Sequence, residues 1–157
     1  MNADIAPAVG KAVVYFTSRR LPVPALMTAR WSDSCMNVVT LSQDDKAVDP
    51  HGRQLDRETS VVHISWNDAK ACCWGNLDDE FDFDDLVVFD DEGTERYALV
   101  TKRLEDGRIN LVTVAESTER YDEGGYPVGE EKNWDDYGFK VVRHISIDEK
   151  KVKPYKA

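Results

Sequence analysis

The sequence lacks any long hydrophobic run, and cysteine is scarce. No apolar stretch approaches the roughly 20 residues of a membrane-spanning helix, and residues 1–9 contain no basic region followed by an apolar segment, so neither a span nor a signal peptide is predicted. The three cysteines, Cys35, Cys72 and Cys73, are an odd number, and two of them are adjacent. This pattern argues against a disulfide framework and favours a reducing cytoplasm.

The sequence also lacks the common motifs for metals and reactive thiols. There is no Cys-x-x-Cys pair or Cys/His ladder of the kind that binds zinc. The acidic segments do not follow the twelve-residue calcium loop with its central glycine and final glutamate. No histidine or lysine pattern marks Cys72 or Cys73 as an activated thiol. We therefore expect no metal and no cofactor.

Positive charge is scarce in the second part of the chain. Residues 1–60 contain seven acidic and seven basic side chains, whereas residues 61–157 contain twenty-three acidic and thirteen basic, which accounts for the net charge of −10. A negative field repels phosphate backbones, so direct binding to nucleic acid is not expected. A partner protein with a basic surface fits this charge better.

A seventeen-residue pattern occurs twice. Ala25–Leu41 and Ala98–Val114 begin 73 residues apart and share eight identical positions. Both copies are rich in residues that favour strands, and the Asp-Gly in the second tolerates the positive φ of a tight turn, so we expect a β-hairpin in each. Asn37 and Asn110, which occupy the same position in the two copies, are expected to bond local backbone at a turn or bulge.

The remaining segments repeat around these hairpins. A strand-like segment precedes each hairpin, at 12–16 and at 86–89, and a closing strand-like segment follows each. Units of about 55–60 residues built from short strands are typical of small barrels. We therefore predict an all-β protein with two barrel units in tandem, with a single intertwined barrel as the alternative. The predicted divisions are a flexible leader (1–9), the first unit (10–66), an acidic linker (67–84), the second unit (85–147) and a charged tail (148–157).

Four shorter segments carry more specific expectations. Two prolines place residues 18–24 in a connection, because proline cannot donate to a central strand. Residues 49–52 form a turn, and residues 67–74 could form about two helical turns. The tail is expected to fray.

The order of these segments carries a resemblance to a known family. Gly10-Lys-Ala-Val-Val-Tyr15, Pro24-Ala-Leu-Met-Thr28, Asn37-Val-Val39 and Thr59-Ser-Val61 follow one another. They resemble the small SH3-like barrel accessory proteins of tailed bacteriophages, where a Gly-x-x-Val-x-Tyr strand precedes Pro-Ala-x-Val-Thr and Val-Asn-Leu strands. The family's closing Trp-His-Trp segment is not found. The resemblance covers residues 10–62 and, through the repeat, 86–114, and it implies SH3-like units, a phage or prophage origin and a binding module without catalytic residues.

Two histidine motifs suggest an enzymatic alternative. His63-Ile-Ser65 and His144-Ile-Ser146 resemble the motifs of two-histidine phosphoesterases, in which each histidine is a general acid or base and each hydroxyl contacts a phosphate oxygen. Such an enzyme would cleave cyclic nucleotides. Against it, both motifs are predicted to fall at equivalent places in the internal repeat, so duplication alone explains their similarity. Few residues follow Ser146, and the helices of that fold are not evident. We therefore favour structural histidines and leave the enzyme as the alternative.

Two further features are candidates for binding. The acidic block 78–85 could mimic DNA phosphates and occupy a nucleic-acid-binding protein, with its phenylalanines as anchors, or it could be a solvated linker whose phenylalanines cover the core. An insertion in the second unit supplies aromatic side chains that could bind a peptide or a base, or fold back as a lid. The candidate binding residues are Phe81, Asp82, Phe83, Asp84, Asp85, Tyr121, Tyr126, Trp134 and Tyr137.

These features together predict a non-enzymatic, phage-type accessory protein in the host cytoplasm. It would engage and inhibit a host factor, such as a defence protein, through the acidic and aromatic surface. The third interpretation is a sponge, in which a pocket between the units holds a small nucleotide without cleaving it. In so acidic a protein that pocket would need local basic residues, and the candidates are Arg19, Arg20, Arg30 and Arg103.

Overall fold

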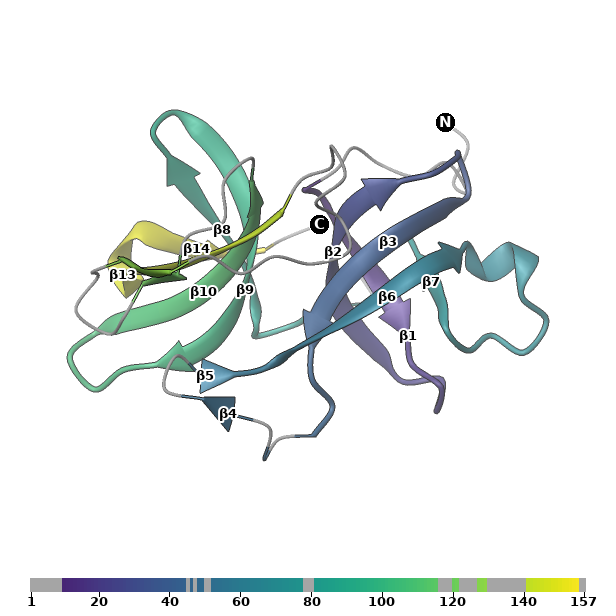
Figure 1. Ribbon diagram of the computed structural model, residues 1–157, viewed down its shortest axis with the longest axis horizontal. Coiled ribbons are helices and arrows are strands. Elements are labelled where there is room, and N and C mark those ends of the chain that lie inside the picture. The colour runs from purple at the N-terminus through teal and green to yellow at the C-terminus, as the bar shows by residue number, and fades with distance from the viewer. Residues whose placement is uncertain are drawn as a thin grey trace.

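The computed structural model describes residues 10–44, 46, 48–49, 52–77, 81–115, 120–121, 127–129 and 141–155. This part of the chain is all-β, as predicted, and forms two five-stranded antiparallel sheets and two short two-stranded hairpins (Figure 1). It includes two 3₁₀ turns, η1 (Ile64–Trp66) and η2 (Glu149–Lys151), and no α-helix. No helix in these residues is long and apolar enough to cross a membrane.

The first sheet has the strand order β6-β3-β2-β1-β7. Its strands are β1 (Ala12–Phe16), β2 (Pro22–Arg30), β3 (Cys35–Leu41), β6 (Leu55–Val62) and β7 (Cys73–Gly75). A single parallel bridge between His63 and Trp74 joins the end of β6 to β7. This bridge brings the two edge strands of the sheet together. Between β3 and β6 the chain makes the small hairpin of β4 (Val48–Asp49) and β5 (Gly52–Arg53), where the sequence predicts the turn at 49–52.

The second sheet has the order β13-β10-β9-β8-β14, so strands that correspond in chain order occupy the same places in both sheets. Its strands are β8 (Leu86–Asp91), β9 (Thr94–Arg103), β10 (Arg108–Ala115), β13 (Val141–Asp148) and β14 (Val152–Pro154). The other short hairpin is β11 (Arg120–Tyr121) with β12 (Pro127–Gly129). Within the described residues no bridge joins β13 to β14.

The repeated sequence forms the β2–β3 and β9–β10 hairpins, as predicted. In the first, the Trp31 N–H donates to the Cys35 carbonyl at 2.9 Å, and in the second the Leu104 N–H donates to the Arg108 carbonyl at the same distance. Both hairpins also have a register shift at the threonine that the two copies share, Thr28 and Thr101. The sequence repeat therefore preserves hydrogen bonding and bulge position as well as strand composition.

Asn37 bonds backbone at a bulge, as expected, but this backbone is not the local one that the sequence predicts. Its buried Oδ1 accepts a hydrogen bond from the Ser60 backbone N–H at 2.9 Å, where the β3–β6 register shifts. The same oxygen accepts from the Trp31 indole N–H at 2.7 Å. The bonded backbone belongs to the neighbouring strand rather than to the turn beside Asn37. One side chain thus holds together the bulge of β6 and the end of the β2–β3 hairpin.

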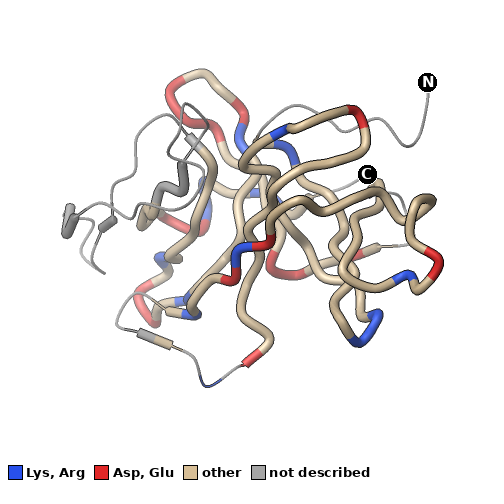
Figure 2. The backbone as a smooth tube through the Cα atoms, turned by 45° about the vertical axis from the view of Figure 1, so that its right-hand side comes forward, with Lys and Arg blue, Asp and Glu red and all other residues tan. Residues whose placement is uncertain are grey.

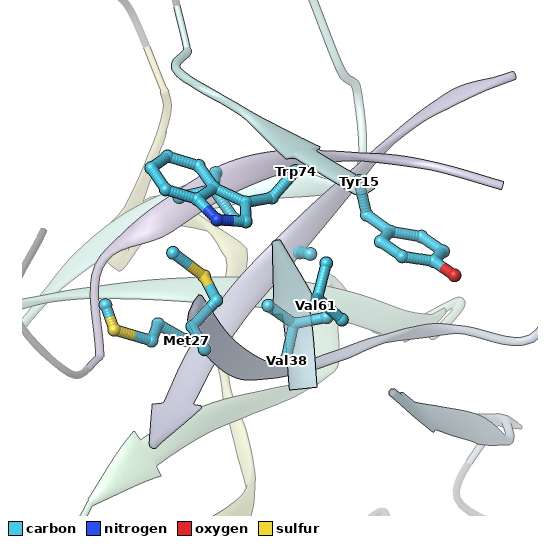
Figure 3. Close-up of a cluster of buried hydrophobic side chains, with 8 residues drawn as sticks. Tyr15, Met27, Val38, Val61 and Trp74 are labelled. Atoms are coloured by element: carbon cyan, nitrogen blue, oxygen red, sulfur yellow. The ribbon is translucent and has the colours of Figure 1, made fainter. Parts of the chain in front are cut away.

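Each sheet has its own core on one face. The first core contains Trp74 and Met27 with residues of β1, β3 and β6, and Figure 3 shows the Trp74 ring over Met27, with Val38 and Val61 beside them. The second core contains Phe89, Leu111 and Ile145 with residues of β8, β9 and β10. Neither core needs side chains from the other sheet.

A third core lies between the two sheets. Leu26, Val39 and Leu41 of the first sheet pack in one cluster with residues of the second, which are Leu86, Leu99, Val112 and Val114. These side chains alternate with those of the separate cores, so the central strands are buried on both faces. The two sheets therefore share a continuous apolar interface.

The β4–β5 hairpin adds a close backbone contact to this interface. Gly52 has φ +123°, and a Cβ at this position would lie 2.3 Å from the carbonyl oxygen of Thr101 in β9. Arg53 lies 3.7 Å from the Asp85 carboxylate just before β8. Only glycine permits this approach of backbone to backbone.

The prediction that residues 18–24 form a connection is wrong at its end, because β2 begins at Pro22 and lies inside the sheet. Pro22 and Pro24 pair with Phe16 and Val14 of β1, whereas β3 pairs with β2 only from Ala25 onward. Residues two apart in a strand present their nitrogens to the same edge. Both prolines can therefore stand where no strand needs their missing N–H.

Two other segments differ from their predicted structure. Residues 67–74 were expected to be a partly helical linker, but Cys73–Gly75 forms β7 at the edge of the first sheet. The tail was expected to fray, but Val152–Pro154 forms β14 against β8, and Tyr155 packs beside the shared core. Strands of three residues are too short to show periodicity, so local sequence gives little sign of them.

Candidate functional site

Along the acidic segment 81–85, aromatic and acidic side chains alternate in exposure. Phe81 and Phe83 are partly buried and stack at a ring-centroid distance of 5.8 Å. Phe81 also meets the Phe16 ring edge-on at 6.2 Å, and Phe83 packs against the shared core. Asp82 and Asp84 are exposed between them. The phenylalanines therefore cover the core, as one of the two readings of this block expected, and the carboxylates face solvent.

The three aspartates of this segment differ in their partners. Asp85 is only partly exposed and lies beside Arg53 across the sheet interface. Asp82 and Asp84 form no ion pair with any described residue. Of the predicted binding aspartates, these two are the ones available to a partner, while Asp85 contributes to the contact between the sheets.

The β8–β9 turn forms a second acidic region, at the opposite end of β8 from Asp82 and Asp84. Figure 2 shows acidic positions on both sides of this turn, at the top of the view. Asp91 is held by the Arg96 guanidinium at 2.6 Å and Asp90 accepts from the Gly93 N–H at 3.1 Å, whereas Glu92 and Glu95 are exposed. Over residues 81–115 there are nine acidic and four basic side chains, so the second unit presents a negative surface here.

The predicted aromatic part of the site is largely outside the described residues. Tyr126, Trp134 and Tyr137 lie outside them, and Tyr121 is described only through its backbone in β11, which pairs with β12. Two other exposed aromatics belong to the first unit and were missed. Trp66 at the end of η1 is 69% exposed, and Trp31 at the β2–β3 turn is 51% exposed. The sequence contains one sign of Trp31's special position. The second copy of the repeat has Leu104 at this place, so the aromatic ring is not part of the shared pattern.

His63 is buried at the junction between β6 and η1, where it caps the 3₁₀ turn. Its Nδ1 accepts from the Ser65 backbone N–H at 3.2 Å and lies 2.8 Å from the Ser65 hydroxyl, while Nε2 lies 3.1 Å from the amide oxygen of Asn76. The backbone bond makes Nδ1 an acceptor, so the proton resides on Nε2 and is donated to Asn76. The His63 ring also meets Trp74 edge-on at 4.5 Å. Both ring nitrogens thus have structural partners.

His144 does not occupy the position equivalent to His63. His144 pairs with Val112 inside the second sheet, and Val39, the repeat counterpart of Val112, pairs with Arg57. The counterpart of His144 is therefore Arg57, and the prediction that the two His-Ile-Ser motifs fall at equivalent places is wrong.

The serines of the two His-Ile-Ser motifs also lie in different surroundings. Ser65 is exposed at η1. Ser146 lies in β13, where it pairs with Asn110 of β10 and its hydroxyl lies 3.3 Å from the Arg108 guanidinium. The two motifs belong to different sheets. His63 bonds Ser65 and Asn76, whereas Ser146 bonds Arg108 of the second sheet.

The arginines named for a nucleotide pocket fall into two groups. Arg30 is paired with Asp33, and Arg103 bonds the Glu149 carboxylate at 2.7 Å and the Asp84 carbonyl at 3.2 Å. Arg19 and Arg20 are exposed on the β1–β2 loop and form no ion pair with any described residue. The structure therefore leaves one basic loop open on the first unit.

Cys72 and Cys73 lie beside the buried Tyr15. Burial, and next a hydrogen bond with Cys72, raise the pKa of the Tyr15 hydroxyl above its ordinary value of 10. Burial likewise raises the pKa of the Cys73 thiol, which is the opposite of what an activated thiol needs. Among the described residues no group of three or more His, Cys, Asp or Glu side chains could hold a metal ion.

Comparison with known proteins gave no match, whether to a family model, to a curated protein or to a solved structure.

Proposed function

We propose that this chain is a non-enzymatic binding protein that engages a partner with a basic surface through the acidic side of its second unit. The observation that carries the proposal is the alternation along 81–85, where the phenylalanines pack inward and fix the segment while Asp82 and Asp84 face solvent. A segment anchored in this way presents its carboxylates in a defined position. Less ordering entropy is then lost on binding.

Electrostatics defines the class of partner. Exposed carboxylates lie at both ends of β8, with Asp82 and Asp84 before the strand and Glu92 and Glu95 after it. Their summed negative field raises the association rate of a positively charged partner and repels nucleic acid. A nuclease or another nucleic-acid-binding protein has the complementary surface. The aromatic side chains of Tyr121, Tyr126, Trp134 and Tyr137 would complete the contact, since aromatic residues supply much of the energy of an interface.

The proposal includes two SH3-like barrel units related by duplication, of the kind found in phage accessory proteins. In support, both sheets have the same strand order, and in both a 3₁₀ turn precedes the short last strand. The shared threonine bulges and hairpin bonds add to this. On this proposal the partner is a host factor, such as a defence protein, encountered in the host cytoplasm.

The test reverses the exposed carboxylates and leaves the interface intact. The variant Asp82→Lys/Asp84→Lys spares Asp85, whose loss would disturb the contact with Arg53. The control is Asp33→Lys/Asp68→Lys, which makes the same change in net charge at exposed positions outside the acidic segment and also breaks the Arg30–Asp33 pair. Each protein is used to capture partners from host lysate, and the affinity of the captured partner is then measured at several salt concentrations.

We expect the second-unit variant to lose a basic partner that the control retains, and the affinity to fall as salt rises. Retention of the same partners by both variants would refute the electrostatic surface. Loss of binding on Trp134→Ala, with Asp82→Lys/Asp84→Lys unaffected, would instead assign the contact to the aromatic insertion alone.

A further inference from the structure

The β1–β2 loop of the first unit is rigidly built and leaves its charged side chains open. Thr17 is buried, and its hydroxyl accepts from the N–H groups of Arg19 and Leu21, both at 3.2 Å. Its backbone N–H donates to the Leu21 carbonyl at 3.0 Å, and its carbonyl accepts from the Arg20 N–H at 2.8 Å. One threonine therefore fixes the whole loop.

This loop contains backbone strain. Arg20 has φ +64°, a left-handed conformation that is unfavourable for a residue with a Cβ. Such strain persists only where surrounding contacts impose it, and it is concentrated at ligand-binding and catalytic positions. Here the contacts are those of Thr17, and their result is that two arginines and Leu21, which is 52% exposed, point away from the core.

A hollow of about 530 Å³ lies between this loop and the chain that follows β3. Its lining is Thr17, Ser18, Arg19, Leu21, Gln43 and Asp44. The second wall is also fixed by a hydroxyl, because Ser42 accepts from the Asp44 N–H at 3.2 Å. The volume lies within the range of small-molecule sites, and both walls are formed before any ligand arrives.

The lining defines the chemistry of an occupant. The Arg19 guanidinium forms no ion pair with any described residue. A guanidinium group matches carboxylate and phosphate oxygens in a bidentate geometry. Asp44 on the opposite wall accepts from the Lys46 backbone N–H at 3.0 Å through one oxygen, which leaves acceptor capacity for an N–H donor. Leu21 supplies an apolar wall between them.

We propose that this hollow binds a small molecule with an oxyanion at one end and an N–H donor at the other, the oxyanion on Arg19 and the donor on Asp44. Arg20, exposed beside the hollow, adds to its positive potential. The site belongs to the first unit and does not depend on the acidic surface of the second. A phosphate ester of an amino-bearing base and an amino acid both have this chemistry, and the experiment separates them.

The test follows the backbone amides of the full chain by NMR during titration with adenosine 5′-monophosphate, L-glutamate and inorganic phosphate at millimolar concentrations. We expect adenosine monophosphate or glutamate to shift the amides of Arg19, Leu21 and Asp44, and the probe that binds identifies the oxyanion as phosphate or carboxylate. Arg19→Gln should weaken this binding about tenfold or more, the loss of a charge-assisted hydrogen bond. The control Arg30→Gln, on the same unit but paired with Asp33, should leave the affinity within about twofold.

Asp44→Asn sharpens the assignment of the donor end. It should strengthen the binding of inorganic phosphate, because a repelling charge is removed, and weaken the binding of glutamate, because its ammonium loses a charged partner. Absence of shifts at these amides with all three probes would overturn the proposal. Equal binding by wild type and Arg19→Gln would overturn it as well.

Discussion

The two sheets have the same strand order but differ in what surrounds it. The first sheet has its edges bridged through His63 and Trp74, and residues 10–77 carry eight basic and seven acidic side chains. The second has no such bridge among its described residues, and its segment 81–115 carries nine acidic and four basic. The sheets thus share a framework and differ in closure and charge.

Positions with the same residue in both sheets lie in the shared core, whereas positions with different residues lie at the ends of the sheets. Leu26 and Leu99, identical in the repeat, both point into the shared core. By contrast, the exposed Trp31 corresponds to Leu104, and Trp66 ends η1 where Lys151 ends η2. The framework is retained where the sheets face each other and varies at their ends. Binding surfaces that differ between the units are expected at those ends.

The largest effect is expected when the Trp74 side chain, which packs at the bridge of the first sheet, is removed. Trp74→Ala deletes a fully buried ring, its contact with His63 and the hydrogen bond from its indole N–H to the Ser34 carbonyl at 2.9 Å. We expect the free energy of unfolding to fall by about 3–5 kcal/mol, measured by urea denaturation.

The matched control is the same substitution at the exposed ring of Trp66, which should change stability by less than about 0.5 kcal/mol. Because the sheets share a core, both variants should unfold in a single transition. Similar losses for both tryptophans, or a separate transition for the second sheet, would contradict this account.

A smaller effect is expected at the close contact between the sheets. Gly52→Ala and Gly107→Ala both place a Cβ at a positive φ, which costs roughly 1 kcal/mol. Only at Gly52 does the new Cβ also meet the Thr101 backbone at 2.3 Å, whereas at Gly107 nothing lies within 4 Å. We expect Gly52→Ala to be more destabilising by about 1–3 kcal/mol, the usual cost of overpacking.

Urea denaturation of the two variants side by side separates the clash from the backbone strain. If the sheets meet as described, the excess loss belongs to their interface. Equal losses for Gly52→Ala and Gly107→Ala would show that the β4–β5 hairpin does not rest on β9.

Much of the sheet framework could be predicted from the repeat. Two copies of one hairpin sequence constrain each other, so the strands and the Asp-Gly turn follow from local chemistry. The bond between Asn37 and the Ser60 backbone joins two strands and does not follow from it. The burial of the second face of each sheet was harder to predict from the sequence. An isolated sheet would expose four of these apolar side chains to solvent, which are Leu26, Val39, Leu99 and Val112. Their apolar character is explained only by the contact between the two sheets.

The candidate site was predicted less well, for reasons that concern particular residues. Identical His-Ile-Ser triplets suggested that His63 and His144 correspond. Strand pairing, which depends on long-range register, shows instead that the residue equivalent to His144 in the first sheet is Arg57. The alternation of phenylalanine and aspartate in 81–85 was visible in the sequence, but the inward direction of the rings depends on Phe16 and the shared core. Sequence could not choose between anchors for a partner and cover for the core.

The smallest effect concerns one acidic residue that distinguishes the two closing strands. Glu58 in β6 pairs with Val38, and Ile145 in β13 pairs with Leu111, the repeat counterpart of Val38. The first sheet therefore holds a partly buried carboxyl where the second buries an isoleucine. Burial, and next the charge of Asp56, raise the pKa of Glu58 above its ordinary value of 4.5.

A raised carboxyl pKa makes the folded state bind more protons than the unfolded state between the two pKa values. Stability contributed by protonated Glu58 is therefore present at low pH and is lost as the pH rises from the unfolded value through the raised folded one. Glu58→Gln cannot ionise, so we expect its urea midpoint to exceed that of the wild type by a margin that grows from about pH 4 to about pH 7. Glu105→Gln, at an exposed position in the β9–β10 turn, makes the same change in net charge and should show no growing margin. A margin for Glu58→Gln that is constant with pH would mean that the first sheet accommodates this charge as readily as solvent does.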